Sequence, residues 1–375
     1  MFNVFRDLDR TLLAVFFSLS MLGLLMMFSA SIDFADHKYG SEFFHMKRQL
    51  FFWVLSLIGF VVVLNVKLEV WEKNSWIFLL GGFVLLILVF VPGIGVKVNG
   101  SYRWLNLGVF NLQSSELAKV GVLMYMASYL LRRQEEVRSQ FMGMFKPMMV
   151  LGLTIVLLLF EPDFGSVVVL SAACLSMIYL SGVRVAFFFG LLFVVGAIGA
   201  VTVVSADYRL QRLECFLDPW AKDHVFGCGY QLTQSLIAIG SGGWFGTGLG
   251  NSVQKLFYLP ESHTDFVFAI LAEEMGLLGG LLVIGLFSTL IYKTMLIART
   301  AETKKQFFGA YFAYGIAVLL AIQVFINIGV NTGLLPTPWL VLVHQLPGAA
   351  GGKGSTYVGA HNSCFVPLWA GTPSV

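Results

Sequence analysis

The sequence predicts an all-α polytopic membrane protein, and three observations lead to this fold class. Hydrophobic residues make up 57% of the 375-residue chain and charged residues only 12%, about half the share found in soluble domains. The apolar residues come in blocks of roughly 20, long enough to cross a bilayer core of about 30 Å. The short alternating segments of a membrane β-barrel are absent from the sequence.

About nine membrane-spanning helices are expected, and a tenth is apparently lost or frameshifted. The first follows a charged N-terminal segment, and its apolar run is long enough to be a true span, so we expect no cleavable signal peptide. The predicted spans are residues 12–31, 49–66, 76–93, 115–131, 148–160, 164–181, 185–205, 265–292 and 307–328.

The distribution of basic residues predicts the orientation of these spans, since Lys and Arg in short loops favour the cytoplasm. The N-terminus and the even-numbered connections then lie inside, with Arg132, Arg133, Arg138, Arg184, Lys293, Arg299, Lys304 and Lys305. The connections at 93–116, 161–165 and 206–264 share the external face. Their polar residues can therefore converge there.

The large extracytoplasmic loop 206–264, between the seventh and eighth spans, gathers much of the polar chemistry. Its glycine-rich run Gly240–Gly250 has neither the Lys-Ser/Thr nor the preceding strand of a phosphate-binding loop. It is expected to serve close helix packing or a re-entrant turn.

The four cysteines show no metal-ligand spacing. Cys215 and Cys228 could pair in an oxidising compartment, but we expect two free thiols.

Asp265 stands where this loop meets an apolar segment, and two interpretations are open. Thr264 or Asp265 is a good N-cap for the following helix. Glu261 and His263 lie within four residues, and a carboxylate at a membrane boundary can be a general base if its neighbours tune its pKa. The two roles are compatible, because a capping carboxylate can also face a cavity.

Glu116 and Lys119 begin the fourth span and share one helix face, since they are three residues apart. They form either a surface ion pair, which is worth little, or a functional pair at membrane depth. In the second case Lys119 could bind a phosphate as a point charge.

Arg103 lies beside Trp104, a pattern typical of anchoring at the membrane interface. The alternative is a contact with phosphate or sugar.

Glu161 and Asp163 flank Pro162, and we expect them to stabilise the turn at this position. Two carboxylates at this position could nevertheless hold a divalent cation.

Four polar residues fall within predicted spans. Glu273 and Glu274 need partners at hydrocarbon depth, for which we expect Lys119 or arginines of the loop. Asn327 and Asn331 predict hydrogen bonds between helices.

Four motifs together resemble the SEDS family (shape, elongation, division and sporulation), whose members polymerise lipid II. They are Gly100-Ser-Tyr-Arg-Trp104, Gln113-Ser-Ser-Glu-Leu-Ala-Lys119, Glu161-Pro-Asp-Phe-Gly165 and Leu259-Pro-Glu-Ser-His-Thr-Asp-Phe266. Within the family, Phe216-Leu-Asp-Pro-Trp220 and Gly229-Tyr-Gln-Leu-Thr-Gln-Ser-Leu236 look like the division-type members. One departure is Ser114, where the family usually has Pro; it is expected to cost some rigidity at the helix start.

The resemblance implies a peptidoglycan glycosyltransferase that polymerises lipid II into glycan strands during septal cell-wall synthesis. Asp265 would be catalytic, and the suspected substrate-binding residues are Glu116, Lys119, Arg103, Glu261 and His263. A divalent cation, Mg or Mn, could take part, with metal ligands unknown and no organic cofactor.

The implied location is the bacterial cytoplasmic (inner) membrane at the division septum. The implied partners are lipid II, undecaprenyl-linked glycan, a class B penicillin-binding transpeptidase and other divisome proteins, with no nucleic acid. The alternative function is a lipid II flippase, since bundles with buried charges also suit transporters. A non-catalytic scaffold is a third possibility. Clustering of the polar motifs on one face favours chemistry over transport.

The resemblance covers a transmembrane domain, residues 1–337, and ends at Gly333-Leu-Leu-Pro-Thr337. The family continues with Lys-Gly-Leu, then Ile-Ser-Tyr-Gly-Gly and a tenth span. Codons for Trp339–Pro347 can be read one base later as Gly-Leu-Ser-Ser-Ser-Ile-Ser-Tyr-Pro. We therefore expect residues 338–375 to form an aberrant tail, either disordered or frameshifted.

Overall fold

The computed structural model describes residues 8–98, 101–107, 111–204, 213–260, 262 and 264–336. Two of the predicted site residues, Glu261 and His263, lie outside the described residues, as does the predicted tail 338–375.

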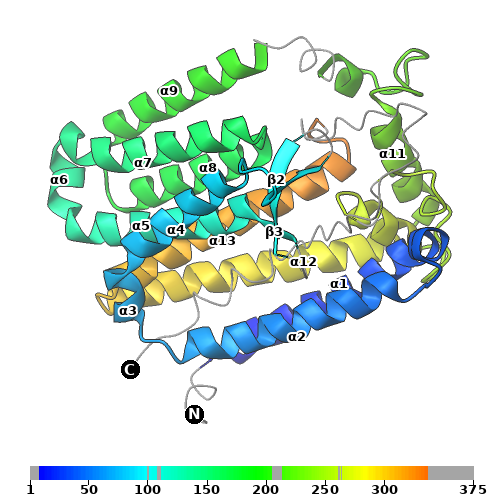
Figure 1. Cartoon of the computed structure of the whole chain (residues 1–375), viewed down its shortest axis with the longest axis horizontal. Coiled ribbons are helices and arrows are strands. Elements are labelled where there is room, and N and C mark those ends of the chain that lie inside the picture. The colour runs from blue at the N-terminus through cyan, green and yellow to red at the C-terminus, as the bar shows by residue number, and fades with distance from the viewer. Residues whose placement is uncertain are drawn as a thin grey trace.

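Long helices run side by side along the long axis of the molecule (Figure 1). A helix overlaps each of the predicted spans, but some helices are longer: the helix of the first span extends to Tyr39 and that of the eighth to Thr303, beyond the predicted ends at 31 and 292. The helices are α1 (Arg10–Tyr39), α2 (Phe44–Leu64), α3 (Leu68–Lys73), α4 (Ser75–Leu88), α5 (Ser114–Arg132), α6 (Gln134–Ser139), α7 (Phe141–Phe160), α8 (Phe164–Leu180), α9 (Val185–Val204), α11 (Tyr230–Gly242), α12 (Val267–Thr303) and α13 (Phe307–Asn331).

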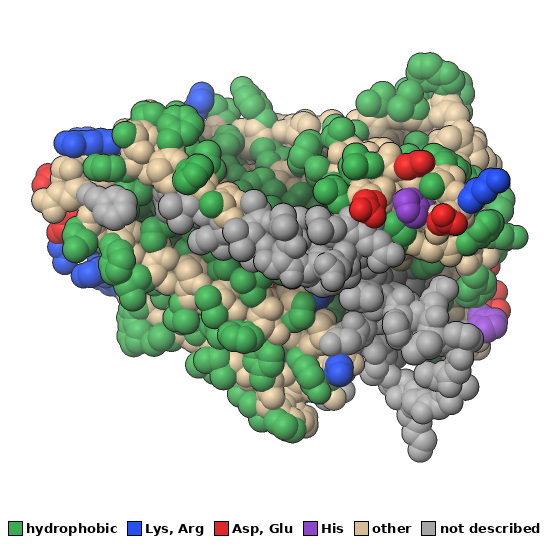
Figure 2. Space-filling model, turned by 90° about the horizontal axis from the view of Figure 1, so that it is seen from above, with side chains coloured by type: hydrophobic (Ala, Val, Ile, Leu, Met, Phe, Trp, Pro, Cys, Tyr) green, Lys and Arg blue, Asp and Glu red, His purple; other side chains and the backbone are tan. Residues whose placement is uncertain are grey.

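The described helices support the class of polytopic membrane protein. Five of them contain segments long and apolar enough to cross a membrane: Arg10–His37, Phe44–Leu64, Met142–Phe160, Val267–Thr303 and Phe307–Asn331. Helices α4 and α8 are apolar but shorter. Charged side chains gather mostly at the two ends of the long axis, with hydrophobic ones along the flank between them (Figure 2). This is the distribution expected of a helical bundle in a bilayer.

The two largest buried clusters each join several helices of the bundle. The larger joins α4, α5, α8 and α13 through fully buried side chains such as Leu86, Met126, Leu170 and Ile316. Gly121 lets α4 and α5 approach closely, since a Cβ there would lie 2.6 Å from the Phe78 carbonyl oxygen.

The second cluster joins α1, α11, α12 and α13 through Met26, Ala238, Ile270 and Val330. It surrounds the first turns of α12, directly after Asp265. The position of that aspartate therefore depends on packing among four helices.

The prediction of helices alone missed a small sheet in the third connection. Strands β1 (Gly95–Val98), β2 (Ser101–Asn106) and β3 (Asn111–Gln113) pair antiparallel in that order. Residues of β2 alternate between more and less buried positions, the pattern of a strand with one covered face. Val98 pairs with Ser101, and the two residues between them in the sequence are Asn-Gly, the strongest short hairpin signal.

The glycine-rich run packs closely on α12, as the sequence predicts. A Cβ on Gly242 would lie 2.0 Å from the Ala272 carbonyl oxygen, and one on Gly246 would lie 2.1 Å from that of Glu274. Helix α12 breaks at Gly276, with φ 67° and ψ −169°. The loop 206–264 thus contains a helix, α11, and a segment inserted against the kink of α12.

Gly246→Ala should lower the melting temperature, because its φ of 83° disfavours a side chain and its Cβ has no room. Strain and overpacking together cost about 1–3 kcal/mol. Gly240→Ala is the matched control, since a Cβ there meets nothing within 4 Å. Within α11 it should stabilise the protein by about 0.5–1 kcal/mol. Thermal unfolding in detergent measures both changes, and equal melting temperatures for the two variants would contradict the packing argument.

Candidate functional site

Arg103 links the small sheet to the turn between α7 and α8. It lies on the covered face of β2 and is 8% exposed. Its Nε donates to the carbonyl oxygen of Glu161 at 2.9 Å, and its Nη2 donates to that of Pro162 at 2.6 Å. Arg103 therefore ties strand to turn instead of projecting to the membrane interface.

Ser114 brings the start of α5 to the same turn. Its hydroxyl is 3.0 Å from Glu161 Oε1 and 3.2 Å from Oε2, and both residues are fully buried. The residue that departs from the family pattern thus makes a polar contact that proline could not.

Asp163 confirms the prediction of turn chemistry. Its carboxylate caps α8, accepting from the backbone N–H of Ser166 at 3.1 Å and from the Ser166 hydroxyl at 2.7 Å. These bonds hold the turn that supplies two carbonyl oxygens to Arg103.

Burial and neighbouring charges shift the pKa values of Glu161 and Arg103. Burial raises the pKa of Glu161 to about 8, with a further increase from Asp163, while the Ser114 hydrogen bond and Arg103 oppose it. Burial lowers the pKa of Arg103, and the charges of Asp163, Glu161 and Asp265 counteract this. Asp265 is thus among the acidic groups whose charge acts on Arg103, which links two predicted site residues electrostatically.

The raised pKa of Glu161 predicts a loss of stability between about pH 4.5 and pH 8. In that window the folded state keeps a proton that the unfolded state has released, so its stability falls as pH rises. Glu161→Gln, which stays neutral, should remove this part of the pH dependence. Melting temperatures at pH 5, 6.5 and 8 test it. Glu135→Gln, on an exposed residue of α6, is the control; an unchanged slope in Glu161→Gln would refute the assignment.

Asp265 lies just before α12, but the prediction that Thr264 or Asp265 caps this helix is wrong. The N-cap is Phe266, and its side chain makes no capping hydrogen bond. The cap comes instead from α13, where Asn331 Oδ1 accepts from the backbone N–H of Ala269 at 3.1 Å. A side chain from another helix satisfies a first-turn donor that a local side chain usually satisfies.

The two asparagines also hold the backbone of Asp265, which confirms the predicted hydrogen bonds between helices. Asn331 Nδ2 donates to the Asp265 carbonyl oxygen at 3.0 Å, and Asn327 Nδ2 donates to it at 3.4 Å. Ser235 of α11 donates to the backbone carbonyl of Asn331 at 2.8 Å. Asn331, fully buried, thereby joins α11, α12 and α13 at the point where the candidate base stands.

Glu116 and Lys119 form the predicted ion pair on α5, at 2.7 Å. The Lys119 side chain is 3% exposed and that of Glu116 is 37% exposed. The pair is therefore half-embedded in the protein, unlike a fully solvated surface pair. It lies on the same helix end as Ser114.

The partners expected for Glu273 and Glu274 were wrong. Glu274 accepts from the Ser29 hydroxyl at 2.6 Å and from Lys255 Nζ at 3.3 Å. Glu273 accepts from the Ser252 hydroxyl and from the backbone N–H of Val253. These partners, of which the side chains of Ser29, Ser252 and Lys255 are buried, come from α1 and from the loop just before Asp265. Two buried carboxylates need a nearby cation. This need was the sequence signal that could have identified Lys255 as a partner.

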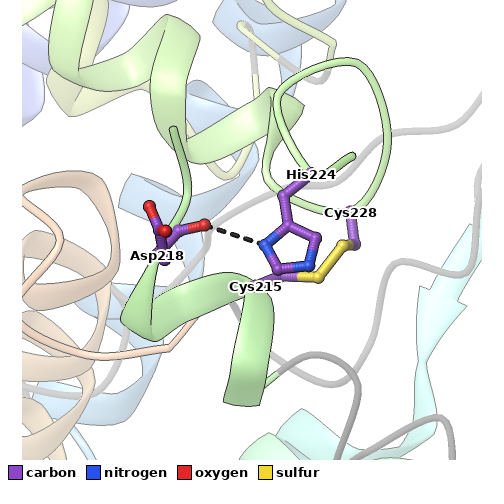
Figure 3. Close-up of a disulfide and its surroundings, with 4 residues drawn as sticks. All are labelled: Cys215, Asp218, His224 and Cys228. Atoms are coloured by element: carbon purple, nitrogen blue, oxygen red, sulfur yellow. Dashed lines mark hydrogen bonds between the residues drawn. A yellow bond between two sulfur atoms is a disulfide. The ribbon is translucent and has the colours of Figure 1, made fainter. Parts of the chain in front are cut away.

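Cys215 and Cys228 form a disulfide, so the expectation of two free thiols was wrong (Figure 3). Their Cα atoms are 6.0 Å apart because the intervening chain turns back on itself. Among the cysteines of the described ranges, Cys174 is free and buried.

The chain is similar to proteins of bacterial cell-wall synthesis. The family model described as cell cycle protein, which covers FtsW, RodA and SpoVE, matches residues 9–344. The peptidoglycan glycosyltransferase FtsW of Hahella chejuensis is 52% identical over 336 residues, covering 89% of this chain and 84% of its own. That of Coxiella burnetii is 52% identical over 325 residues and covers 87% of each chain.

Two kinds of solved structure share the fold. A chain from a peptidoglycan synthase complex that coordinates polymerization and crosslinking aligns with TM-score 0.71 and 24% identity, over 88% of both chains. The rod shape determining protein RodA of Thermus thermophilus aligns with TM-score 0.65 and 22% identity, over 97% of this chain and 94% of its own.

Proposed function

Because this chain belongs to the FtsW, RodA and SpoVE family, we propose that it is a peptidoglycan glycosyltransferase that polymerises lipid II for septal cell-wall synthesis. Relatives roughly 50% identical over most of the chain are named for this activity. The observation that supports the reaction site best is the arrangement at Asp265, whose backbone is held by Asn331 and whose charge acts on Arg103.

Asp265 serves as the general base in this proposal. It takes the proton from the 4-hydroxyl of GlcNAc on one lipid II as that oxygen attacks the anomeric carbon of the lipid-linked glycan. The new bond is β-1,4, the bond to the undecaprenyl pyrophosphate breaks, and the leaving group carries the electron pair away. Attack from the far side inverts the α-linked donor.

Basic residues stabilise the pyrophosphate as it leaves. Arg103 has five N–H donors, of which Nε and one on Nη2 hold the α7–α8 turn. Its positive charge, on which the charge of Asp265 acts, is suited to a developing anion. Lys119, oriented by Glu116, supplies a second point charge. Glu261 and His263 are proposed to contact substrate because they adjoin Asp265 in the sequence.

A magnesium or manganese ion fits poorly between Glu161 and Asp163. The Glu161 carboxyl group is fully buried against Ser114 and keeps its proton at neutral pH. The Asp163 carboxylate is occupied in capping α8. A divalent cation therefore remains a proposal only for partly exposed carboxylates such as Glu116 and Asp265.

In this proposal the nine helices at the predicted ranges cross the cytoplasmic membrane, with Asp265 on the external side. The disulfide in the loop suits an oxidising compartment. At the opposite end, Lys293 of α12 pairs with Asp9 at 3.1 Å, bringing the N-terminal segment to the basic side.

We also propose a class B penicillin-binding transpeptidase and other divisome proteins as partners, since a structural neighbour belongs to a peptidoglycan synthase complex.

Purified protein given labelled lipid II tests this proposal. Glycan chains measured by gel electrophoresis support the glycosyltransferase. The alternative, a lipid II flippase, predicts movement of the label across liposomes without chain formation. Addition of a chelator to the same assay tests the divalent cation.

A further inference from the structure

Cys215, His224 and Cys228 form a compact group in the loop before α11, outside the proposed reaction. One ligand atom from each, two sulfurs and an imidazole nitrogen, all lie within 4.8 Å of one another. Cys215 is buried, His224 half-buried and Cys228 exposed. Thiolate and imidazole are the ligands that zinc prefers.

Backbone hydrogen bonds hold His224 close to the chain around Cys228 independently of the disulfide. The His224 carbonyl oxygen accepts from the N–H groups of Gly227 at 2.9 Å and Gly229 at 3.0 Å, on either side of Cys228. The His224 N–H donates to the Ala221 carbonyl oxygen at 2.9 Å. On the Cys215 side, the Asp218 N–H donates to the Glu214 carbonyl oxygen at 3.1 Å, and the Asp218 carbonyl oxygen is 2.8 Å from His224 Nδ1. Opening the sulfur–sulfur bond would therefore leave hydrogen bonds that connect both cysteine segments to His224.

The imidazole of His224 is prepared for a metal. Its Nδ1 is 2.8 Å from the backbone carbonyl oxygen of Asp218. A carbonyl oxygen only accepts, so Nδ1 carries the proton and Nε2 keeps its lone pair. In Figure 3 the other edge of the ring is turned toward the disulfide. A ring N–H bonded to a carbonyl is the usual outer support of a metal-binding histidine.

We propose that the reduced form of this loop binds one zinc-class ion through Cys215, Cys228 and His224. An ion about 2.3 Å from two sulfurs in tetrahedral geometry keeps them roughly 3.8 Å apart, within the 4.8 Å that the ligand atoms already span. Three protein ligands leave one position for water. The soft thiolates disfavour magnesium and manganese, so this site is distinct in chemistry from a cation at carboxylates.

The conversion balances in two steps. A dithiol reductant gives two electrons and two protons to the disulfide, becoming a disulfide itself and leaving two cysteine thiols. The divalent ion then replaces the two thiol protons, which pass to solvent. The two ends of the segment 215–228 can thus be joined in two alternative ways, by the disulfide or by the metal ion.

Cobalt(II) binding to the full-length protein in detergent tests this site, because thiolate coordination gives an intense near-ultraviolet charge-transfer band. Protein is reduced with a dithiol, desalted without oxygen and titrated with cobalt. We expect one equivalent to bind in tetrahedral geometry, to be displaced by zinc, and to be absent from oxidised protein. A reduced protein without the charge-transfer band would overturn the proposal.

Variants assign the ligands. Cys215→Ser and Cys228→Ser should each lose binding, whereas Cys174→Ala, at the free buried cysteine, should bind as wild type. His224→Gln should bind at least about tenfold more weakly, since even changes to outer-shell partners cost that much. This variant can still form the disulfide, so the melting temperature of its oxidised form reports its folding. Undiminished binding in His224→Gln or in both cysteine variants would refute the site.

Discussion

The Asp265→Asn protein is expected to polymerise lipid II about 10²–10⁴-fold more slowly than wild type, the usual contribution of a general base. The amide has nearly the same shape but cannot accept the acceptor-sugar proton. The backbone of residue 265 is held through its carbonyl oxygen by Asn331 and Asn327, which this substitution leaves unchanged. The fold should therefore survive while the rate falls.

Initial rates of glycan formation by purified protein measure this effect, and thermal unfolding verifies the fold. Asp36→Asn is a matched control, because Asp36 is an exposed acid on α1 and its change should leave the rate near wild type. Polymerisation by Asp265→Asn at the normal rate would remove Asp265 from the role of base. A wild-type protein that moves lipid II but makes no chains would instead favour the transporter alternative.

The helices could be predicted from the sequence because the signal for each one is local. A block of apolar residues needs no knowledge of its neighbours, and every predicted span contains a helix in the structure. The ion pair of Glu116 and Lys119 was predictable for the same reason, since a spacing of three places both on one helix face. The β1–β2 hairpin also had a local signal, Asn-Gly between alternating residues, which the strongly apolar composition obscured.

The contacts around Asp265 could not be predicted because they join residues far apart in the sequence. An N-cap is expected from the residue beside the helix, yet Asn331 supplies the capping oxygen from α13. Buried carboxylates require some partner, but sequence alone does not show that Lys255 is nearest to Glu274. The disulfide likewise depends on turns that bring two cysteines together across 13 positions.

Asn331→Leu is expected to reduce kcat by about a hundredfold, since a displacement of about 1 Å at a reacting group can cost that much. Leucine has a similar volume but removes the bond to the Asp265 carbonyl and the cap on Ala269. The Ala269 N–H keeps its bond to the Phe266 carbonyl oxygen at 3.0 Å, so the loss of the two Asn331 side-chain hydrogen bonds costs about 0.5–1.5 kcal/mol of stability each. Rates should therefore be compared well below the lower melting temperature.

The kinetic pattern separates a positioning residue from a merely structural one. Asn331 acts through Asp265, so its loss should lower kcat more than it raises KM. Asn327→Leu is the graded control, because Asn327 is half-buried and its bond to the same carbonyl is longer, 3.4 Å against 3.0 Å. A smaller loss in Asn327→Leu would follow from that geometry. If Asn331→Leu kept the wild-type kcat, the hydrogen bonds from α13 would be shown to support the helix without directing the base.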